Sequence, residues 1–357
     1  MNENRFQLLQ KRIVEIVKTS AKDSEGAIKN LRELRKEMEE TIEAESLELC
    51  NALAAILEAE GDIFRKAKKP VDAEKVYKEM MNFSNKLYQA DKETYDYRQG
   101  ISFYKLASLY RTGLQCNLIL PKPKQLNDAQ KKLFGMAEIF YKNAMACITE
   151  KAKKGRLLHV ELHSTIMNEI AVMYASVGNY GKAAELGLNG VQVDKTIYDK
   201  YDDKVHGMRL ASRMNILAAI YVYNKDHVHA AEILEDANFV LERHEKDEPI
   251  SAALLLGRNL LNLGGCYKQI DEEKENAEEA LLQGLNKILE IDAKAKGMLA
   301  DDVMMASITL GDHFRNEKEE KQAKEHYLRA KQRASLLLQK TKNARYQNIL
   351  KRLEQYV

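Results

Sequence analysis

Glycine and proline are scarce in this chain, whose 357 residues include 17 glycines and 4 prolines. Because these residues interrupt helices and form tight turns, their scarcity favours a fold of long helices. Tryptophan is absent, and no run of apolar residues is long enough to cross a bilayer. The N-terminus lacks the apolar core of a signal peptide, so we expect a cytoplasmic protein without a membrane partner.

Excess charge of either sign is also missing, since 56 basic residues nearly balance 54 acidic ones. A net charge of +2 argues against a nucleic-acid partner. The cysteines are far apart and form no CxxC pair, so the pattern suggests neither a zinc ribbon nor a thioredoxin-type site. We expect reduced, buried thiols at all four positions, Cys50, Cys116, Cys147 and Cys266.

What the chain does contain is one pattern in six copies. A small residue is followed three positions later by an aromatic residue, and a second small residue comes twelve positions after the first. One copy has one extra residue in this spacing, and another has a long insertion. The copies begin at Gly61, Ala107, Ala171, Ala218, Gly264 and Gly311, mostly 46 or 47 residues apart. A fixed step of this length indicates stacked structural repeats.

Packing of one helix on another explains the pattern. Two small residues that face each other let paired helices approach closely, and the aromatic residue fills the space beyond that contact. In the stretch "ASVGNYGKA", Gly178 and Asn179 are expected to end a first helix, because both tolerate left-handed backbone. Neither helix can bury its apolar stripe alone, so neighbouring copies must stack.

The copies resemble the tetratricopeptide repeat (TPR) family. The family pattern W-x2-L-G-x2-Y…A-x3-F is matched by Leu310-Gly311-Asp-His-Phe314, with Ala323 and Tyr327 following. Asn168–Tyr174 and Asn215–Tyr221 are similar to the first helices of long-helix, kinesin-light-chain-like members. The resemblance implies an all-α fold, a right-handed α-solenoid of stacked antiparallel helix pairs forming a TPR-like superhelix. The 46–47-residue unit exceeds the family's usual length of about 34, which predicts longer helices.

We predict a single TPR-like solenoid over residues 1–357. Residues 1–45 would form a degenerate N-terminal repeat, and residues 46–338 would form the six clear repeats. An insertion near residues 112–132 either lengthens the helices of its copy or forms a lobe over the groove. Residues 340–357 place their apolar side chains on one face and are expected to cap the last repeat.

Residues that could carry chemistry are few. "HVELH" puts His159 and His163 on one helical face, but Glu161 is not at the position of the HExxH motif and no third ligand is evident. Packing or solvated histidines are the simpler interpretation. No nucleophile with a paired base is evident either. We therefore predict no catalytic residue, no metal and no cofactor, and a protein that is not an enzyme.

Candidate binding residues lie on the first helix of each copy, which lines the concave groove in proteins that this chain resembles. Asparagines could bond the main chain of an extended peptide, basic residues could favour an acidic or C-terminal carboxylate, and tyrosines could give flat apolar contact. Ordinary solvated side chains are the alternative. The predicted groove residues are Asn168, Asn215, Asn262, Arg111, Arg258, Lys268, Arg315, Tyr104 and Tyr223.

The function predicted from these features is a protein–protein interaction scaffold that binds a peptide or protein segment in its concave groove without catalysis. The partner's identity stays open, and self-association into a homo-oligomer is compatible with the sequence. An alternative is a peptide-sensing regulator whose superhelix changes shape on binding. An enzyme with the insertion as a lid would need a cluster of titratable residues near 112–132, which the sequence does not show.

Overall fold

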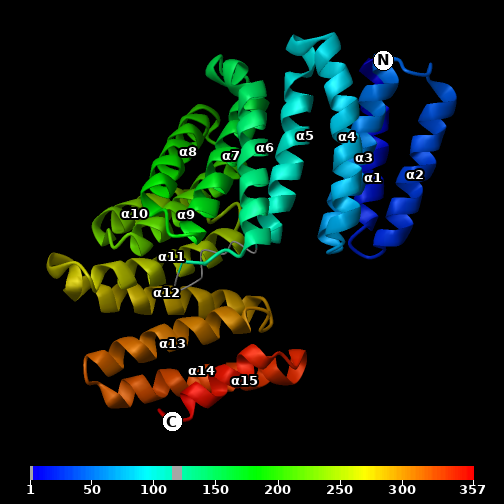
Figure 1. Cartoon of the computed structure of the whole chain (residues 1–357). Coiled ribbons are helices and arrows are strands. Elements are labelled where there is room, and N and C mark those ends of the chain that lie inside the picture. Colours follow the sequence, from blue (N-terminus) through cyan, green and yellow to red (C-terminus); the bar gives the residue numbers. More distant parts are fainter. Residues whose placement is uncertain (1–2, 115–122) are drawn as a thin grey trace. The chain divides into compact units, whose positions relative to one another are not determined.

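The computed structural model describes residues 3–114 and 123–357, and all regular structure in these ranges is helical (Figure 1). Most helices are 17 to 26 residues long, as the scarcity of glycine and proline predicts. No helix in the described ranges is long and apolar enough to span a membrane. The helices are α1 (Glu3–Thr19), α2 (Ser24–Thr41), α3 (Leu47–Lys66), α4 (Pro70–Ala90), α5 (Lys92–Gly113), α6 (Asp128–Lys153), α7 (Leu157–Ser176), α8 (Tyr180–Tyr201), α9 (Lys204–Tyr223), α10 (His227–His244), α11 (Ser251–Tyr267), the short 3-10 helix η1 (Asp271–Glu273), α12 (Lys274–Lys294), α13 (Ala300–Asn316), α14 (Glu320–Thr341) and α15 (Ala344–Leu353).

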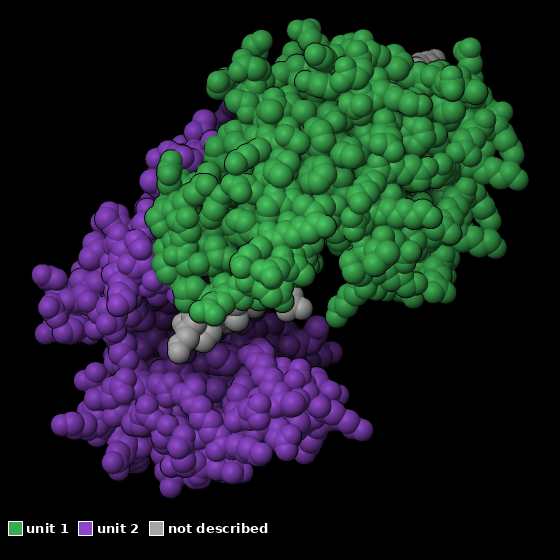
Figure 2. Space-filling model, in the orientation of Figure 1, with its two compact units in different colours: residues 1–186 green, residues 187–357 purple. Residues whose placement is uncertain are grey.

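The chain divides into two compact units, Met1–Leu186 and Gly187–Val357 (Figure 2). In the first unit, α3 packs against α4 and α5 packs against α6. In the second unit, the corresponding pairs are α9 with α10, α11 with α12, and α13 with α14. The predicted all-α fold of stacked helix pairs is therefore confirmed within each unit. A single solenoid over residues 1–357 stays a prediction.

The repeated small residues are close-packing sites, as predicted. Gly264 faces the backbone of Ala277, the second small residue of its copy, as expected, whereas Gly61 and Gly311 have a different nearest neighbour. A Cβ atom added to Gly61 would lie 2.3 Å from a ring atom of Tyr77 in the paired helix. Gly311 and Tyr327 repeat this contact, at 2.6 Å. In these two copies, the first small residue thus lies under the bulky residue one turn beyond the second small residue. Glycine is needed because the tyrosine ring lies directly on the helix backbone.

Four turns between paired helices share one geometry. The residue four positions after the aromatic residue has left-handed backbone, and the next N–H donates to the carbonyl of the aromatic residue. For Phe64, this donor is Lys69 at 2.9 Å. The prediction of left-handed backbone at Gly178 is confirmed. The other three turns use lysines, Lys68, Lys225 and Lys318.

The two ends of the chain are also helical. In the first unit, α1 packs against α2 and α3, and Asp23 caps α2 by accepting a hydrogen bond from the Gly26 N–H. In the second unit, α15 packs against α14, and its Tyr346 and Leu353 are buried in the core cluster of α13 and α14. The ring of Tyr356 stacks on Tyr327 at 4.7 Å.

Part of the predicted insertion, together with Cys116, lies outside the described residues. Its described end is fixed within the first unit by Lys124, whose backbone N–H donates to the Ser176 carbonyl at 2.8 Å. The Lys124 ammonium donates to the Leu114 carbonyl at 2.6 Å. Helix α6 then begins with a capping box formed by Asn127 and Gln130.

The described cysteines are free thiols. Cys50 and Cys266 are buried, and Cys147 is half-buried. Burial raises the pKa of Cys266 to about 11, so its sulfur stays protonated and unreactive near neutral pH. The prediction of buried thiols is therefore confirmed at Cys50 and Cys266, and it is wrong at Cys147, which is partly exposed.

Two buried histidines lie in the last helix pair. His313 is 4% exposed, and neither ring nitrogen has a hydrogen-bond partner among the described residues. His326 stacks on Phe314 with the rings 14° from parallel. Burial lowers the pKa of both histidines, helped by Lys268 at His313 and by Arg329 at His326. The carboxylates of Glu278 and Glu317 act in the opposite direction at His313, and Glu325 does so at His326.

We expect the chain to lose stability as the pH falls below the unfolded-state histidine pKa of about 6.5. Below that pH the histidines bind protons in the unfolded state but not yet in the folded state. The loss of folding free energy therefore grows until the pH passes the lowered folded-state pKa values. Thermal unfolding at pH 7.5 and 5.5 should show a drop of about 2–4 °C, the shift expected for about 1 kcal/mol. The variant His313→Leu/His326→Phe should lose most of this drop, and an equal drop in the variant would contradict the assignment.

Candidate functional site

Two of the predicted asparagines lie side by side in the second unit. Asn215 on α9 and Asn262 on α11 are one 47-residue repeat apart, so they occupy equivalent positions on successive first helices. The Asn262 side-chain amide donates to the Asn215 side-chain oxygen at 3.3 Å. Asn215 in turn donates to Asn259, three residues before Asn262 on the same face of α11. We call these three residues the asparagine ladder.

The asparagine ladder runs from solvent into the protein. Asn262 is exposed, Asn215 is half-buried and Asn259 is fully buried. Asn262 donates to Asn215 and Asn215 donates to Asn259, so Asn215 orients the Asn262 amide and Asn259 orients Asn215. A chain of amides in a region of low dielectric polarises each member and strengthens its hydrogen bonds. The Asn262 side chain is thus held with its oxygen and one N–H available at the surface.

An oriented, exposed carboxamide matches the main chain of a peptide. Its oxygen can accept a peptide N–H and its remaining N–H can donate to a peptide carbonyl. This pairing recognises backbone, whatever the side chains of the ligand. Because Asn262 is already oriented, little rotamer entropy would be lost on binding.

In the first unit, two predicted residues meet at a carboxylate that sequence analysis missed. Tyr104 and Arg111 on α5 both bond Glu169 on α7, through the tyrosine hydroxyl at 3.0 Å and the arginine Nε at 3.0 Å. The hydroxyl of Tyr141 on α6 donates to the same carboxylate. The side chains of Arg111 and Glu169 are only 21% and 18% exposed. This cluster links three helices of two consecutive copies.

The electrostatics of the Glu169 cluster indicate that it stabilises the structure. Burial alone would raise the pKa of Glu169, but the charge of Arg111 and the three hydrogen bonds hold that pKa below its usual value. Burial and the negative charge of Glu169 raise the pKa of Tyr104 and Tyr141. Glu169 is thus a saturated acceptor and a weak base. The arrangement positions the Tyr104 ring and offers no group ready to move a proton.

Charges along α3 and α5 are paired in the same way. The ammonium of Lys105 lies 2.6 Å from Asp62 and 3.3 Å from Glu58, and Arg98 lies 3.0 Å from Glu58. Asp62 also accepts the hydroxyl of Tyr77 at 2.6 Å. These charges of α3 and α5 are therefore neutralised within the unit.

The other predicted basic residues have varied surroundings in the second unit. Arg258 on α11 pairs with Asp302 on α13 at 2.6 Å. The guanidinium of Arg315 lies 4.7 Å from the ring centre of Tyr356, under the C-terminal segment. Lys268 directly follows α11, is half-buried and has no ion pair within the described part of the chain. A ligand carboxylate would have to displace Asp302 to reach Arg258.

The two remaining predicted residues lie on α7 and α9. Asn168 is half-buried on α7, in the first unit, one residue before Glu169. Tyr223 is the last residue of α9 and is half-buried. Their roles in binding stay predictions.

The histidine pair of α7 has a structural explanation. His159 lies 3.0 Å from the Asp96 carboxylate and beside the ring of Tyr97, while burial lowers the pKa of His163. Asp96 also pairs with Lys151 at 3.1 Å. Across residues 3–114 and 123–357, no group of three or more His, Cys, Asp or Glu side chains could hold a metal ion.

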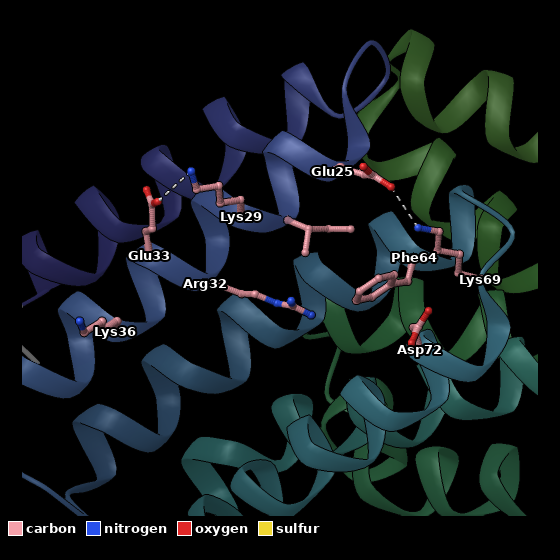
Figure 3. Close-up of a pocket in the computed structure, with 9 residues that line it drawn as sticks. Glu25, Lys29, Arg32, Glu33, Lys36, Phe64, Lys69 and Asp72 are labelled. Atoms are coloured by element: carbon pink, nitrogen blue, oxygen red, sulfur yellow. Dashed lines mark hydrogen bonds and ion pairs between the residues drawn. The ribbon is translucent and has the colours of Figure 1, made fainter.

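An open pocket of about 520 Å³ lies among α2, α3 and α4, away from the predicted residues (Figure 3). Arg32 and Phe64 point toward one another across it, with the guanidinium 6.0 Å from the ring centre. The rim consists of ion pairs such as Glu25 with Lys69 at 3.5 Å. Most of the charged side chains that line this pocket are therefore already paired.

The residues missed by sequence analysis left faint signals. Asn259 is a polar residue inside the apolar run "LLLGRNLLNLGG", three residues before a predicted site. Glu169 follows Asn168 directly, on a helix with little charge. Only the stacking of first helices from successive copies shows what these side chains meet.

Comparison with known proteins gives structural matches only, since neither a protein-family model nor the sequence of a curated protein matches this chain. BtubC (BKLC) from P. vanneervenii is 18% identical, with a TM-score of 0.53 over 81% of this chain and 92% of that protein. The apo form of RapI is 15% identical, with a TM-score of 0.63 over 97% of this chain and 81% of that protein. A Rap protein complexed with competence and sporulation factor reaches a TM-score of 0.45 at 13% identity, over 98% and 99% of the two chains, which is too low to support an argument.

The structural neighbours are TPR-like repeat proteins. Sequence identities this low show a shared fold and nothing further. They agree with the resemblance found in the sequence and with the packing of small and aromatic residues described above. The chain thus has the fold of the TPR-like helical repeat proteins.

Proposed function

We propose that this protein is a non-catalytic interaction scaffold that binds an extended peptide or protein segment on the face formed by its first helices. The observation that carries the proposal is the asparagine ladder, Asn215, Asn259 and Asn262. A peptide would lie along α9 and α11, and its main chain would pair with the Asn262 amide. Neighbouring side chains of α11 and α13 would then select the ligand's side chains.

Pre-organisation is the physical basis of this function. The Asn262 side chain is held by Asn215, which itself donates to the buried Asn259, and α9 and α11 are held by the core cluster that contains Leu210, Met214 and Leu256. A surface that is already ordered loses little entropy when a flexible segment docks. The saturated carboxylate of Glu169 in the first unit agrees with a binding role rather than a catalytic one.

The test is selection of binding peptides from a random displayed library, followed by affinity measurements on variants. Asn215→Ala/Asn262→Ala should weaken the selected peptides roughly tenfold or more, since each lost hydrogen bond costs about 0.5–1.5 kcal/mol. Asn276→Ala/Asn286→Ala removes two exposed asparagines of α12 and should leave affinity unchanged. Equal affinity of both variants for every selected peptide, or a selection that yields none, would refute the proposal.

A second candidate, the peptide-sensing regulator, is favoured by the division of the chain into two compact units. Here the bound peptide would change the arrangement of the units. Small-angle scattering with and without a selected peptide separates the candidates. A ligand-dependent change in the scattering curve supports the sensor, and superimposable curves support the rigid scaffold.

A further inference from the structure

Positive charge is concentrated at the C-terminal end of the second unit. The last 37 residues, 321–357, contain ten Lys and Arg but two Glu and no Asp, in a chain whose net charge is +2. Helix α14 alone carries a net charge of +4. The corresponding second helices of the two preceding pairs, α10 and α12, carry −3 and −2. The charge of α14 is therefore not a general property of second helices in this unit.

The outward face of α14 combines this charge with apolar side chains. Helix α14 packs against α13 and α15 (Figure 1), and its inner face buries residues such as Ala323, Tyr327 and Ala330. On the opposite face, Leu328 and Leu336 are 43% and 47% exposed. They are eight residues apart, which is about 12 Å along a helix. Lysines flank them on the same helix.

The arginines and lysines of this region differ in their partners. The arginines are neutralised within the unit, for example Arg333 by Asp292 at 3.0 Å and Arg352 by Asp312 at 2.9 Å. The lysines of α14 have no ion pair among the described residues of the unit. Three of them flank the two leucines, Lys321, Lys324 and Lys331. We call these lysines, with Leu328 and Leu336, the α14 face.

We propose that the α14 face docks an acidic amphipathic helix of a partner protein. Carboxylates on the partner would pair with the lysines, and two apolar side chains about two turns apart would cover the leucines. Two leucines are too few for a helix face that inserts into a bilayer, where apolar area dominates binding. Nucleic acid would use the lysines through its phosphates and leave the leucines uncovered. This surface belongs to a second helix and does not depend on peptide binding at the asparagine ladder.

The test measures binding of labelled probes to the intact protein by fluorescence anisotropy. The main probe is a synthetic helix of glutamate, alanine and leucine, with leucines two turns apart on one face. A peptide of the same composition with its leucines spread around the helix is the control for amphipathicity. Phosphatidylserine-containing vesicles and single-stranded poly(dT) probe the membrane and nucleic-acid alternatives.

Two variants of the α14 face and one matched control complete the design. Lys321→Glu/Lys324→Glu/Lys331→Glu and Leu328→Ser/Leu336→Ser should each weaken the amphipathic probe at least tenfold. The control, Lys195→Glu/Lys225→Glu/Lys246→Glu, makes the same change in net charge at exposed lysines elsewhere in the unit and should bind as the wild type does. Because the substituted side chains are largely outward-facing, the variants should keep their helical circular dichroism and melting temperature.

The binding results either support or overturn helix docking at the α14 face. Binding of the amphipathic probe that both α14-face variants lose and the charge control keeps supports the proposal. It is overturned if the wild type fails to bind that probe, if the permuted peptide binds equally well, or if vesicles or poly(dT) bind and the peptide does not.

Discussion

Gly264→Ala is expected to destabilise the protein by up to about 2 kcal/mol. A Cβ atom at this position would lie 2.8 Å from the backbone carbonyl oxygen of Ala277 and 2.7 Å from Leu281 Cγ. A backbone carbonyl in a packed helix cannot move aside cheaply, and overpacking of this kind costs about 1–3 kcal/mol. That cost outweighs the gain of at most about 1 kcal/mol from replacing glycine by alanine in a helix.

The next residue provides a matched control. Gly265 is also in α11, but a Cβ atom there would meet no atom within 4 Å. Gly265→Ala should therefore stabilise the protein by up to about 1 kcal/mol, through helix propensity alone. Because the propensity gain is common to both variants, their free energies of unfolding in urea should differ by the overpacking cost alone, about 1–3 kcal/mol. Equal stabilities would mean that α11 and α12 do not approach as closely as described.

Glu169→Ala is expected to cost about 3 kcal/mol or more. The substitution leaves Arg111 with most of its side chain buried and no counter-charge, and it leaves the hydroxyls of Tyr104 and Tyr141 without their acceptor. Removing one partner of a buried ion pair typically costs about 3–5 kcal/mol. The partial exposure of this pair places the expected loss at the lower end. Urea unfolding gives the value directly.

One further substitution separates charge from hydrogen bonding, and another serves as a control. Glu169→Gln keeps an acceptor oxygen for a tyrosine hydroxyl and removes the charge, so it should cost less than Glu169→Ala. Glu185→Ala removes an exposed carboxylate from α8 and should change stability by less than about 0.5 kcal/mol. If the glutamine and alanine variants are equally unstable, loss of the ion pair with Arg111 accounts for the whole destabilisation. If Glu169→Ala resembles Glu185→Ala, the cluster contributes nothing.

The fold could be predicted because its main determinant is a local pattern. Small residues at a regular spacing from an aromatic residue indicate two helices in contact, and the recurrence of this pattern in six copies, four of them with identical spacing, indicates stacking. Gly61 under Tyr77 and Gly311 under Tyr327 show the pattern's physical content. The facing residue was predicted less well, because spacing along one helix does not fix which turn of its partner lies opposite.

The candidate site could be predicted in part. Asn215 and Asn262 were found because equivalent positions on successive first helices are neighbours after stacking. Asn259 and Glu169 were missed because their partners come from helices far away in the sequence. The pairing of Arg258 with Asp302, a contact between different copies, was missed for the same reason. Side-chain partners across copies depend on rotation of each helix about its axis, which composition and spacing do not determine.

The left-handed turns lower the stability of this protein below what its fold allows. Lys68, Lys225 and Lys318 have positive φ angles of 58°, 61° and 64°, a conformation that costs a residue with a side chain about 1 kcal/mol or more relative to glycine. The connections between helices, outside the core, thus contain residues that make the fold less stable than glycine would. An engineer could recover this stability with glycine at these turns while keeping every helix face, and hence every binding surface, unchanged.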